Sequence, residues 1–106
     1  MTNRERLPDR RASESFDLEC RGLRYCCTFT RYADGRLAEV FVESNKAGSA
    51  ADIASRDAAI AASFAFQHGA TVDDVRRALC RDGFGLAQGP LGVALDKIVG
   101  LREVAR

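Results

Sequence analysis

The residues of this chain that could do chemistry begin with its four cysteines, which are Cys20, Cys26, Cys27 and Cys80. None of them forms a C-x-x-C pair, and two adjacent cysteines make a poor tetrahedral metal pair and a strained disulfide. No apolar run is long enough to span a bilayer, and we expect no signal peptide. We therefore expect reduced thiols in a cytoplasmic protein, with no metal and no cofactor.

A nucleophile paired with a general base is a second possible chemistry, and His68 is the only histidine that could act as the base. The candidate nucleophiles would be Ser49, Ser55 and Ser63. His68 falls in the last turn of a predicted helix, where a cation complements the helix dipole, so capping is its favoured role. Ser55 and Ser63 fit better as small residues of a packed helix. The sequence thus predicts no free-standing catalytic centre.

A lysine, a glycine and a serine precede the longest predicted helix, in the run NKAGS at residues 45–49. Backbone N–H groups, the helix dipole and Lys46 could together hold a phosphate at this point. The run lacks the spacing of a phosphate-binding loop, and short motifs often match by chance. The favoured interpretation makes Ser49 the helix N-cap and Gly48 the residue of a tight turn.

Residues 1–15 are polar and rich in arginine, without a period of 2 or 3.6. We predict a flexible arm that precedes the folded domain at residues 16–106. Arg10 and Arg11 are either a solvated pair or a clamp on a carboxylate or phosphate, and the solvated pair is favoured.

The element that organises the chain is a helix predicted over residues 50–68. Ile53, Ile60 and Phe64 lie on one side of it and alanines cover most of the rest, so we expect the helix to be buried nearly all round. Asp57 falls in line with the three large side chains. A carboxylate on an apolar stripe needs a partner, which predicts a structural polar anchor or a contact in a subunit interface.

Three runs before this helix alternate apolar and polar residues, as half-buried strands do. They cover residues 16–21, 23–32 and 37–44. Gly22 breaks the first two runs, and Asp34-Gly35 separates the second from the third, which is a strong hairpin signal. The alternation puts Cys27 on the core face and Cys26 on the wetter face.

Two further helices follow the central one. The first is capped by Thr71 and ends at Asp82-Gly83, with Arg76, Arg77 and Arg81 facing outward. The last begins at Pro90 and keeps a 3.6 period to about Val104. The predicted fold class is therefore α+β, a three-stranded antiparallel meander packed on a central buried helix and followed by two helices (βββααα).

Size and charge limit the possible partners. The chain has 106 residues, enough for one domain with a single core, and a net charge of +1. That charge gives no electrostatic case for nucleic acid or membrane as a partner. An exposed sheet edge at the first strand and the need to cover the apolar helix both favour a homodimer.

Taken in order, several short motifs resemble the TSCPD-domain family over residues 7–98. They are LPDRR with Ser13-Glu14, YADGR at residues 32–36, AEVF at 38–41, KAGS at 46–49, DAA at 57–59, SFAFQHG at 63–69, GPLG at 89–92 and LDKI at 95–98. This domain occurs near the C-terminus of adenosylcobalamin-dependent ribonucleotide reductases and as small free-standing proteins of bacteria and phages. The Thr-Ser-Cys-Pro-Asp motif that names the family is absent here.

The resemblance implies a non-catalytic accessory or regulatory domain in DNA precursor metabolism. It does not imply ribonucleoside-diphosphate reductase activity by itself, since the catalytic barrel of a reductase needs several hundred further residues. We expect docking on a reductase subunit or self-association, with Arg10, Arg11, Lys46, Gly48 and Ser49 as contacts. Two alternatives stay open. One is phosphate capture at residues 46–49, and the other is a thiol relay through Cys20 or Cys26.

Overall fold

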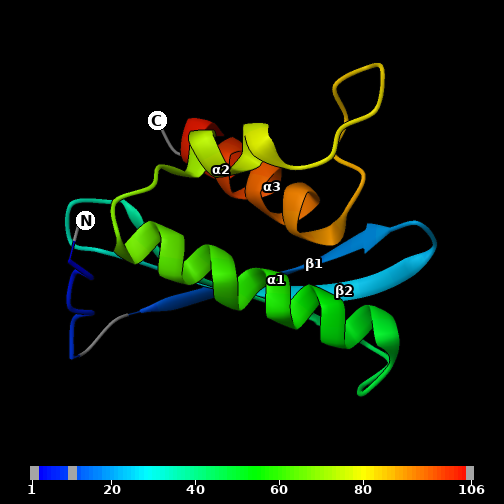
Figure 1. Cartoon of the computed structure of the whole chain (residues 1–106), viewed down its shortest axis with the longest axis horizontal. Coiled ribbons are helices and arrows are strands. Elements are labelled where there is room, and N and C mark those ends of the chain that lie inside the picture. The colour runs from blue at the N-terminus through cyan, green and yellow to red at the C-terminus, as the bar shows by residue number, and fades with distance from the viewer. Residues whose placement is uncertain (1–2, 10–11, 105–106) are drawn as a thin grey trace.

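The computed structural model describes residues 3–9 and 12–104, and shows a three-stranded sheet followed by three helices (Figure 1). The elements are β1 (Ser13–Cys20), β2 (Leu23–Arg31), β3 (Leu37–Ser44), α1 (Ala50–Gln67), α2 (Val72–Ala78) and α3 (Pro90–Val104). The order confirms the predicted α+β class. β1 starts three residues earlier than predicted, so residues 13–15 belong to the sheet and not to the arm.

The sheet is an antiparallel meander in the order β1-β2-β3. β1 and β2 turn at Arg21-Gly22, where both residues have positive φ (50° and 78°), as a two-residue hairpin of type I′ requires. β2 and β3 meet at the predicted Asp34-Gly35 turn, and Gly35 again has a positive φ of 93°. The Asp34 carboxylate accepts a hydrogen bond from the backbone N–H of Arg36 (3.1 Å), which fixes this turn.

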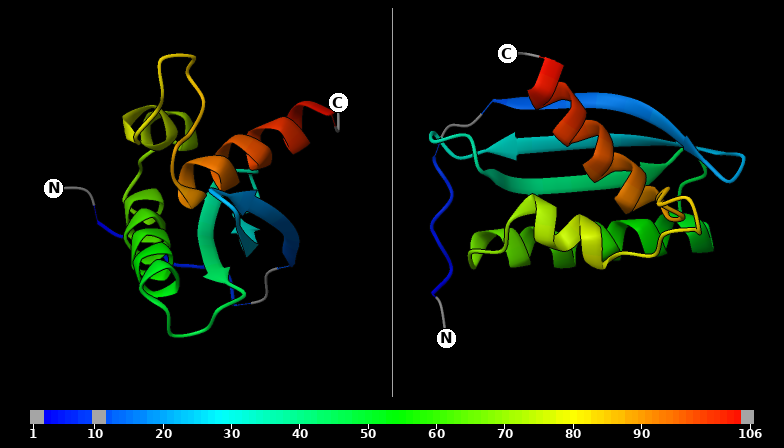
Figure 2. Two further views of the ribbon diagram at one scale, coloured as in Figure 1. Left: turned by 90° about the vertical axis from the view of Figure 1, so that its right-hand side faces the viewer. Right: turned by 90° about the horizontal axis from the view of Figure 1, so that it is seen from above.

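The inward face of the sheet carries the core; α3 crosses this face, and α1 lies along the β3 edge of the sheet. In the right-hand view of Figure 2, α1 runs along β3 while α3 crosses the strands obliquely. The core joins side chains of the sheet, of α1 and of α3; its most deeply buried members are Cys27, Phe29, Val40, Val42, Ala59, Ala94, Leu95 and Ile98. Cys27 is fully buried and Cys26 is exposed, as the alternation predicted.

The prediction that α1 is buried nearly all round was wrong. Ile53, Ile60 and Phe64 are 52%, 48% and 47% exposed, and the buried face contains polar side chains. Those polar residues are Asp52, Ser55, Ser63 and Gln67. The helix therefore turns three large apolar side chains outward, and its buried face combines Phe66 and small alanines with hydrogen-bonding groups.

The buried polar side chains of α1 bond the outer edge of β3, which pairs with no strand among the described residues. Ser63 Oγ accepts from the N–H of Val40 (2.9 Å) and donates to its carbonyl oxygen (2.9 Å). Gln67 Nε2 donates to Ala38 O (3.1 Å), and Ser55 Oγ donates to Val42 O (3.2 Å). Buried backbone groups need partners, and α1 supplies them as a further strand would.

Helix α2 is shorter than predicted, because it ends at Ala78 and not at Asp82-Gly83. Arg76 in α2 and Arg81 after it were predicted to face outward, and the structure shows otherwise. Arg81 donates to both carboxylate oxygens of Asp96 on α3 (2.8 and 2.9 Å), and Arg76 donates to the same carboxylate (3.1 Å). These bonds tie α2 and the following loop to α3.

Candidate functional site

The loop before α1 has the geometry of an N-cap. Ser49 Oγ accepts from the N–H of Asp52 (3.2 Å), and Gly48 has the positive φ of 78° that its turn needs. The Asp52 carboxylate accepts from the N–H groups of Gly48 and Ser44, both at 2.9 Å. These two bonds hold the pKa of Asp52 below its usual value, although burial acts to raise it. The bond from Gly48 has the larger effect. A phosphate at this helix end would meet a carboxylate already bonded to the Gly48 amide, which weighs against phosphate capture.

The described part of the predicted arm contacts the folded domain. The N–H of Glu5 donates to the carbonyl oxygen of Gln67 at the end of α1 (2.6 Å), and Tyr32 Oη donates to Glu5 O (3.1 Å). The Glu5 carboxylate also pairs with Arg36 (2.8 Å). Glu5 thereby joins the end of α1 to the β2–β3 turn. Arg10 and Arg11 lie outside the described residues.

The exposed apolar side of α1 is the first candidate docking surface. We call Ile53, Ile60 and Phe64 the α1 stripe, because their spacing of seven and four residues puts them on one side of the helix. Asp57 lies in this stripe and is exposed, so water solvates its carboxylate and it needs no structural partner. The guanidinium carbon of Arg4 lies 4.5 Å from the centre of the Phe64 ring, in a cation–π contact.

The predicted capping role of His68 fits its position as the C-cap residue of α1. Its Nδ1 lies 2.8 Å from Phe64 O, so the ring bonds a carbonyl of the last turn. The two buried serines of α1 are also engaged, since the Ser55 and Ser63 hydroxyls bond strand and helix carbonyl oxygens. None of these three side chains is arranged as a nucleophile with its base.

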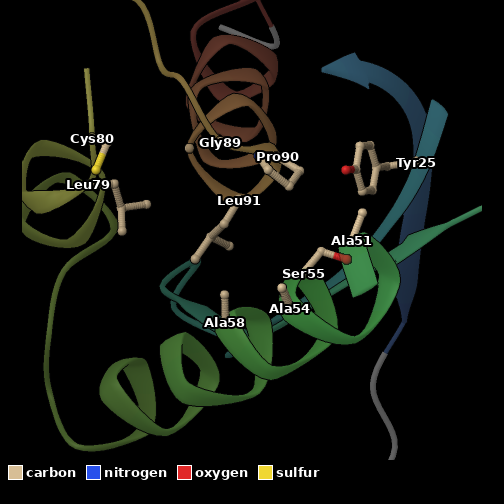
Figure 3. Close-up of a pocket in the computed structure, with 11 residues that line it drawn as sticks. Tyr25, Ala51, Ala54, Ser55, Ala58, Leu79, Cys80, Gly89, Pro90 and Leu91 are labelled. Carbon is tan, nitrogen blue, oxygen red and sulfur yellow. The ribbon is translucent and has the colours of Figure 1, made fainter. Parts of the chain in front are cut away.

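A groove of about 320 Å³ is the second candidate surface, and the sequence did not reveal it. Its floor is the N-terminal half of α1, and its walls are the residues just after α2, the start of α3 and Tyr25 of β2 (Figure 3). The lining is mostly small and apolar; it includes Ala51, Ala54, Ala58, Leu79, Gly89, Pro90 and Leu91. Tyr25 is 5% exposed, and within the described residues its hydroxyl has no hydrogen-bond partner.

The loop between α2 and α3 is the third surface. It extends away from the body of the molecule in Figure 1, where it is drawn in yellow and orange. Phe84 is 93% exposed and Leu86 is 65% exposed. A phenylalanine at this exposure in an ordered loop is unusual, because the buried core normally takes such side chains.

The thiols divide by exposure. Cys20 and Cys27 are buried, while Cys26 and Cys80 are exposed. Burial, helped by the neighbouring Cys26, raises the pKa of Cys27 to about 12, so this thiol stays protonated at neutral pH. Among the described residues, no cluster of three or more histidine, cysteine or carboxylate side chains is suited to a metal ion. A thiol relay through Cys20 or Cys26 stays a prediction.

Comparison with known proteins gives one informative relative. The chain is similar to the vitamin B12-dependent ribonucleotide reductase of Bradyrhizobium diazoefficiens, with 34% identity over 74 residues. The match covers 70% of this chain and 6% of that protein, so the chain spans only a small fraction of its relative's length. No family model matches, and neither does any solved structure. No helix of the described part is long and apolar enough to cross a membrane. The chain is therefore related to a ribonucleotide reductase, and membership of the TSCPD-domain family stays a prediction.

Proposed function

We propose that this chain is a non-catalytic accessory domain that docks on a vitamin B12-dependent ribonucleotide reductase and so acts in DNA precursor metabolism. The observation that carries the proposal is the α1 stripe, in a chain related to a small segment of a much larger reductase. A segment of a large protein has the rest of that protein to pack against, and the α1 stripe is an exposed apolar surface of the kind that such packing uses.

The α1 stripe has the composition of an interface core. It presents one aromatic and two aliphatic side chains, each about half exposed, on a helix held rigidly against β3. Charged groups flank it, namely Arg4 at Phe64 and the exposed Arg56 and Asp57 between the apolar residues. Apolar residues surrounded by charges are typical of a docking surface with a polar rim.

The described contacts predicted from the sequence lie beyond the N-terminal end of this stripe. Lys46, Gly48 and Ser49 precede the N-terminal end of α1, and the docked part of the arm meets its C-terminal end at Gln67. Arg10 and Arg11 follow that part of the arm in sequence. We include these five residues in the proposed contact surface, as a polar addition to the apolar stripe.

The test is a binding measurement between the purified full chain and the vitamin B12-dependent reductase of the same organism. The double variant Ile60→Ser, Phe64→Ser removes two half-exposed apolar side chains. Burying each would contribute about 1 kcal/mol, so we expect the dissociation constant to rise about 30-fold. Leu101→Ser is the matched control, because Leu101 is 49% exposed on α3, outside the stripe.

Three results bear on the proposal. Tight binding of wild type and Leu101→Ser with weak binding of the double variant would support it. Absence of binding by the wild-type chain would contradict docking, and equal binding by all three proteins would contradict the α1 stripe as the docking surface.

Arg10→Ala with Arg11→Ala tests the arm. We expect the affinity for the reductase to fall by no more than about five-fold per arginine, since exposed ion pairs contribute little.

A further inference from the structure

The exposed loop between α2 and α3 is held in one conformation by its own hydrogen bonds. The Asp82 carboxylate accepts from the N–H groups of Phe84 (2.8 Å) and Leu86 (3.0 Å). The backbone of Asp82 bonds Leu86 and Gly85 (both 3.0 Å), and Arg81 donates to Gly85 O (2.9 Å). Phe84 and Leu86 are thus presented to solvent with their N–H groups already bonded, and little order is lost when a partner buries them.

The apolar groove offers a complementary surface. Its volume of about 320 Å³ lies at the low end of the roughly 300–1,000 Å³ typical of sites for drug-sized ligands, which suits one or two side chains. Ala54 and Ala58 on its floor leave the α1 backbone accessible to a bulky ring. The hydroxyl of Tyr25, in the groove wall, can donate a hydrogen bond to a carbonyl oxygen of an incoming loop.

The loop and the groove are adjacent on the molecule. Cys80 and Gly89, at the two ends of the loop, line the groove, while the loop itself extends outward (Figures 1 and 3). Because a two-fold axis exchanges the two copies, an arrangement that puts one copy's loop into the second copy's groove also puts the second loop into the first groove. Such a contact is self-complementary and closes at two copies.

We propose that two copies of this chain form a dimer by exchanging the apolar loop tips, so that Phe84 and Leu86 of each copy fill the groove of the other. The contact goes beyond docking on a reductase, because it needs only this chain. It also differs from pairing through the edge of β1, since it forms no strand-to-strand backbone pairing.

The first test is sedimentation velocity of the purified full chain across a range of concentrations. Phe84→Ser removes a side chain that is 93% exposed, so it leaves the fold intact and removes two contacts per dimer. We expect the dissociation constant of the dimer to rise about 10²- to 10⁴-fold. Ala58→Trp puts a bulky side chain into the groove itself, so that the partner's loop cannot enter, and should raise the dissociation constant by a similar factor. Far-UV circular dichroism would establish that both variants are folded.

Mixing the two variants gives a sharper result than either alone. The Phe84→Ser chain keeps an open groove, and the Ala58→Trp chain keeps its apolar loop. A mixture can therefore form a heterodimer with one of the two contacts intact. We expect energy transfer between labelled chains in the mixture, at concentrations where each variant alone is monomeric.

The outcomes separate this proposal from docking on a reductase. A wild-type chain that stays monomeric at all concentrations would overturn the dimer. A dimer unaffected by Phe84→Ser and Ala58→Trp would overturn the loop exchange, and so would a mixture without energy transfer. Ile60→Ser with Phe64→Ser should weaken binding to the reductase and leave the dimer unchanged, so either proposal can fail without the other.

Discussion

Replacing Ser63 by alanine tests whether α1 is held in place by its bonds to the edge of β3. Ser63 is 6% exposed and Val40 is fully buried. Its hydroxyl oxygen accepts from the Val40 N–H at 2.9 Å, and its proton is shared between Val40 O and Ala59 O, both at 2.9 Å. The substitution removes the acceptor of a buried donor without changing the apolar packing around it.

The size of the effect follows from three contributions. A buried N–H without an acceptor costs about 1–3 kcal/mol, and the lost donation by the hydroxyl costs about 0.5–1.5 kcal/mol. Alanine has the better helix propensity, which offsets about 0.5 kcal/mol. We expect the free energy of unfolding of Ser63→Ala to fall by about 1–4 kcal/mol. The melting temperature should fall by about 4–8 °C for each kcal/mol.

Ser55→Ala is the matched control on the same helix. The Ser55 hydroxyl donates to Val42 O (3.2 Å) and Asp52 O (2.9 Å), and no strand N–H among the described residues donates to it. Its loss leaves no buried donor without a partner, so the expected destabilisation is below about 1 kcal/mol. Urea unfolding of both variants gives the comparison, and hydrogen exchange should show faster loss of the Val40 amide proton in Ser63→Ala alone.

A Ser63→Ala protein as stable as wild type would refute the reasoning. The same conclusion would follow if Ser55→Ala were the more destabilised of the two variants. Either result would mean that α1 is held by its apolar contacts and that its polar bonds to β3 contribute little.

Two further predictions concern titratable groups. At pH 8, iodoacetamide should label Cys26 and Cys80 in the folded chain and reach Cys27 only in denaturant; equally fast labelling of Cys27 would contradict its burial. The hydrogen bond from Arg81 holds the pKa of Asp96 below its usual value, so this carboxylate stabilises the fold at neutral pH and loses that effect as the pH falls through the lowered pKa. Asp96→Asn should be less stable than wild type in urea at pH 7, with the difference disappearing in acid.

The sheet could be predicted from the sequence because its signals are local. Alternation over the three strands and a D-G turn give the strands, their order and the faces of Cys26 and Cys27. The N-caps Ser49 and Thr71 were also predictable, since capping depends on a side chain and an N–H group three residues apart.

The orientation of α1 was not predicted, because a hydrophobic period does not tell whether a helix packs on the face of a sheet or along its edge. On a face, large apolar side chains turn inward. Along an edge, the helix must supply partners for unpaired backbone groups. The signal was present in Asp52, Ser55, Ser63 and Gln67, which share one side of the helix. Interpreting the serines only as small residues missed it.

The apolar groove, the α2–α3 loop and the Asp96 ion pairs depend on tertiary contacts. Arg76 and Arg81 were expected to face solvent, yet Asp96 lies 20 and 15 residues further along the chain and bonds both. Nothing near Phe84 in sequence shows that it points outward. A glycine-spaced run with two large apolar residues, too short to form an element of its own, is the signal that could have indicated an exposed contact loop.

The arrangement of α1 connects the fold with the proposed interactions. Because its polar side chains close the edge of β3, a further strand cannot pair there without displacing the helix. The same rotation of the helix turns Ile53, Ile60 and Phe64 outward. Sealing the sheet edge and creating the apolar stripe are thus two consequences of one orientation. A variant that detached α1 from β3 would lose both the closed sheet edge and the apolar stripe. Docking on the reductase should therefore weaken in Ser63→Ala only if the substitution loosens α1 from β3.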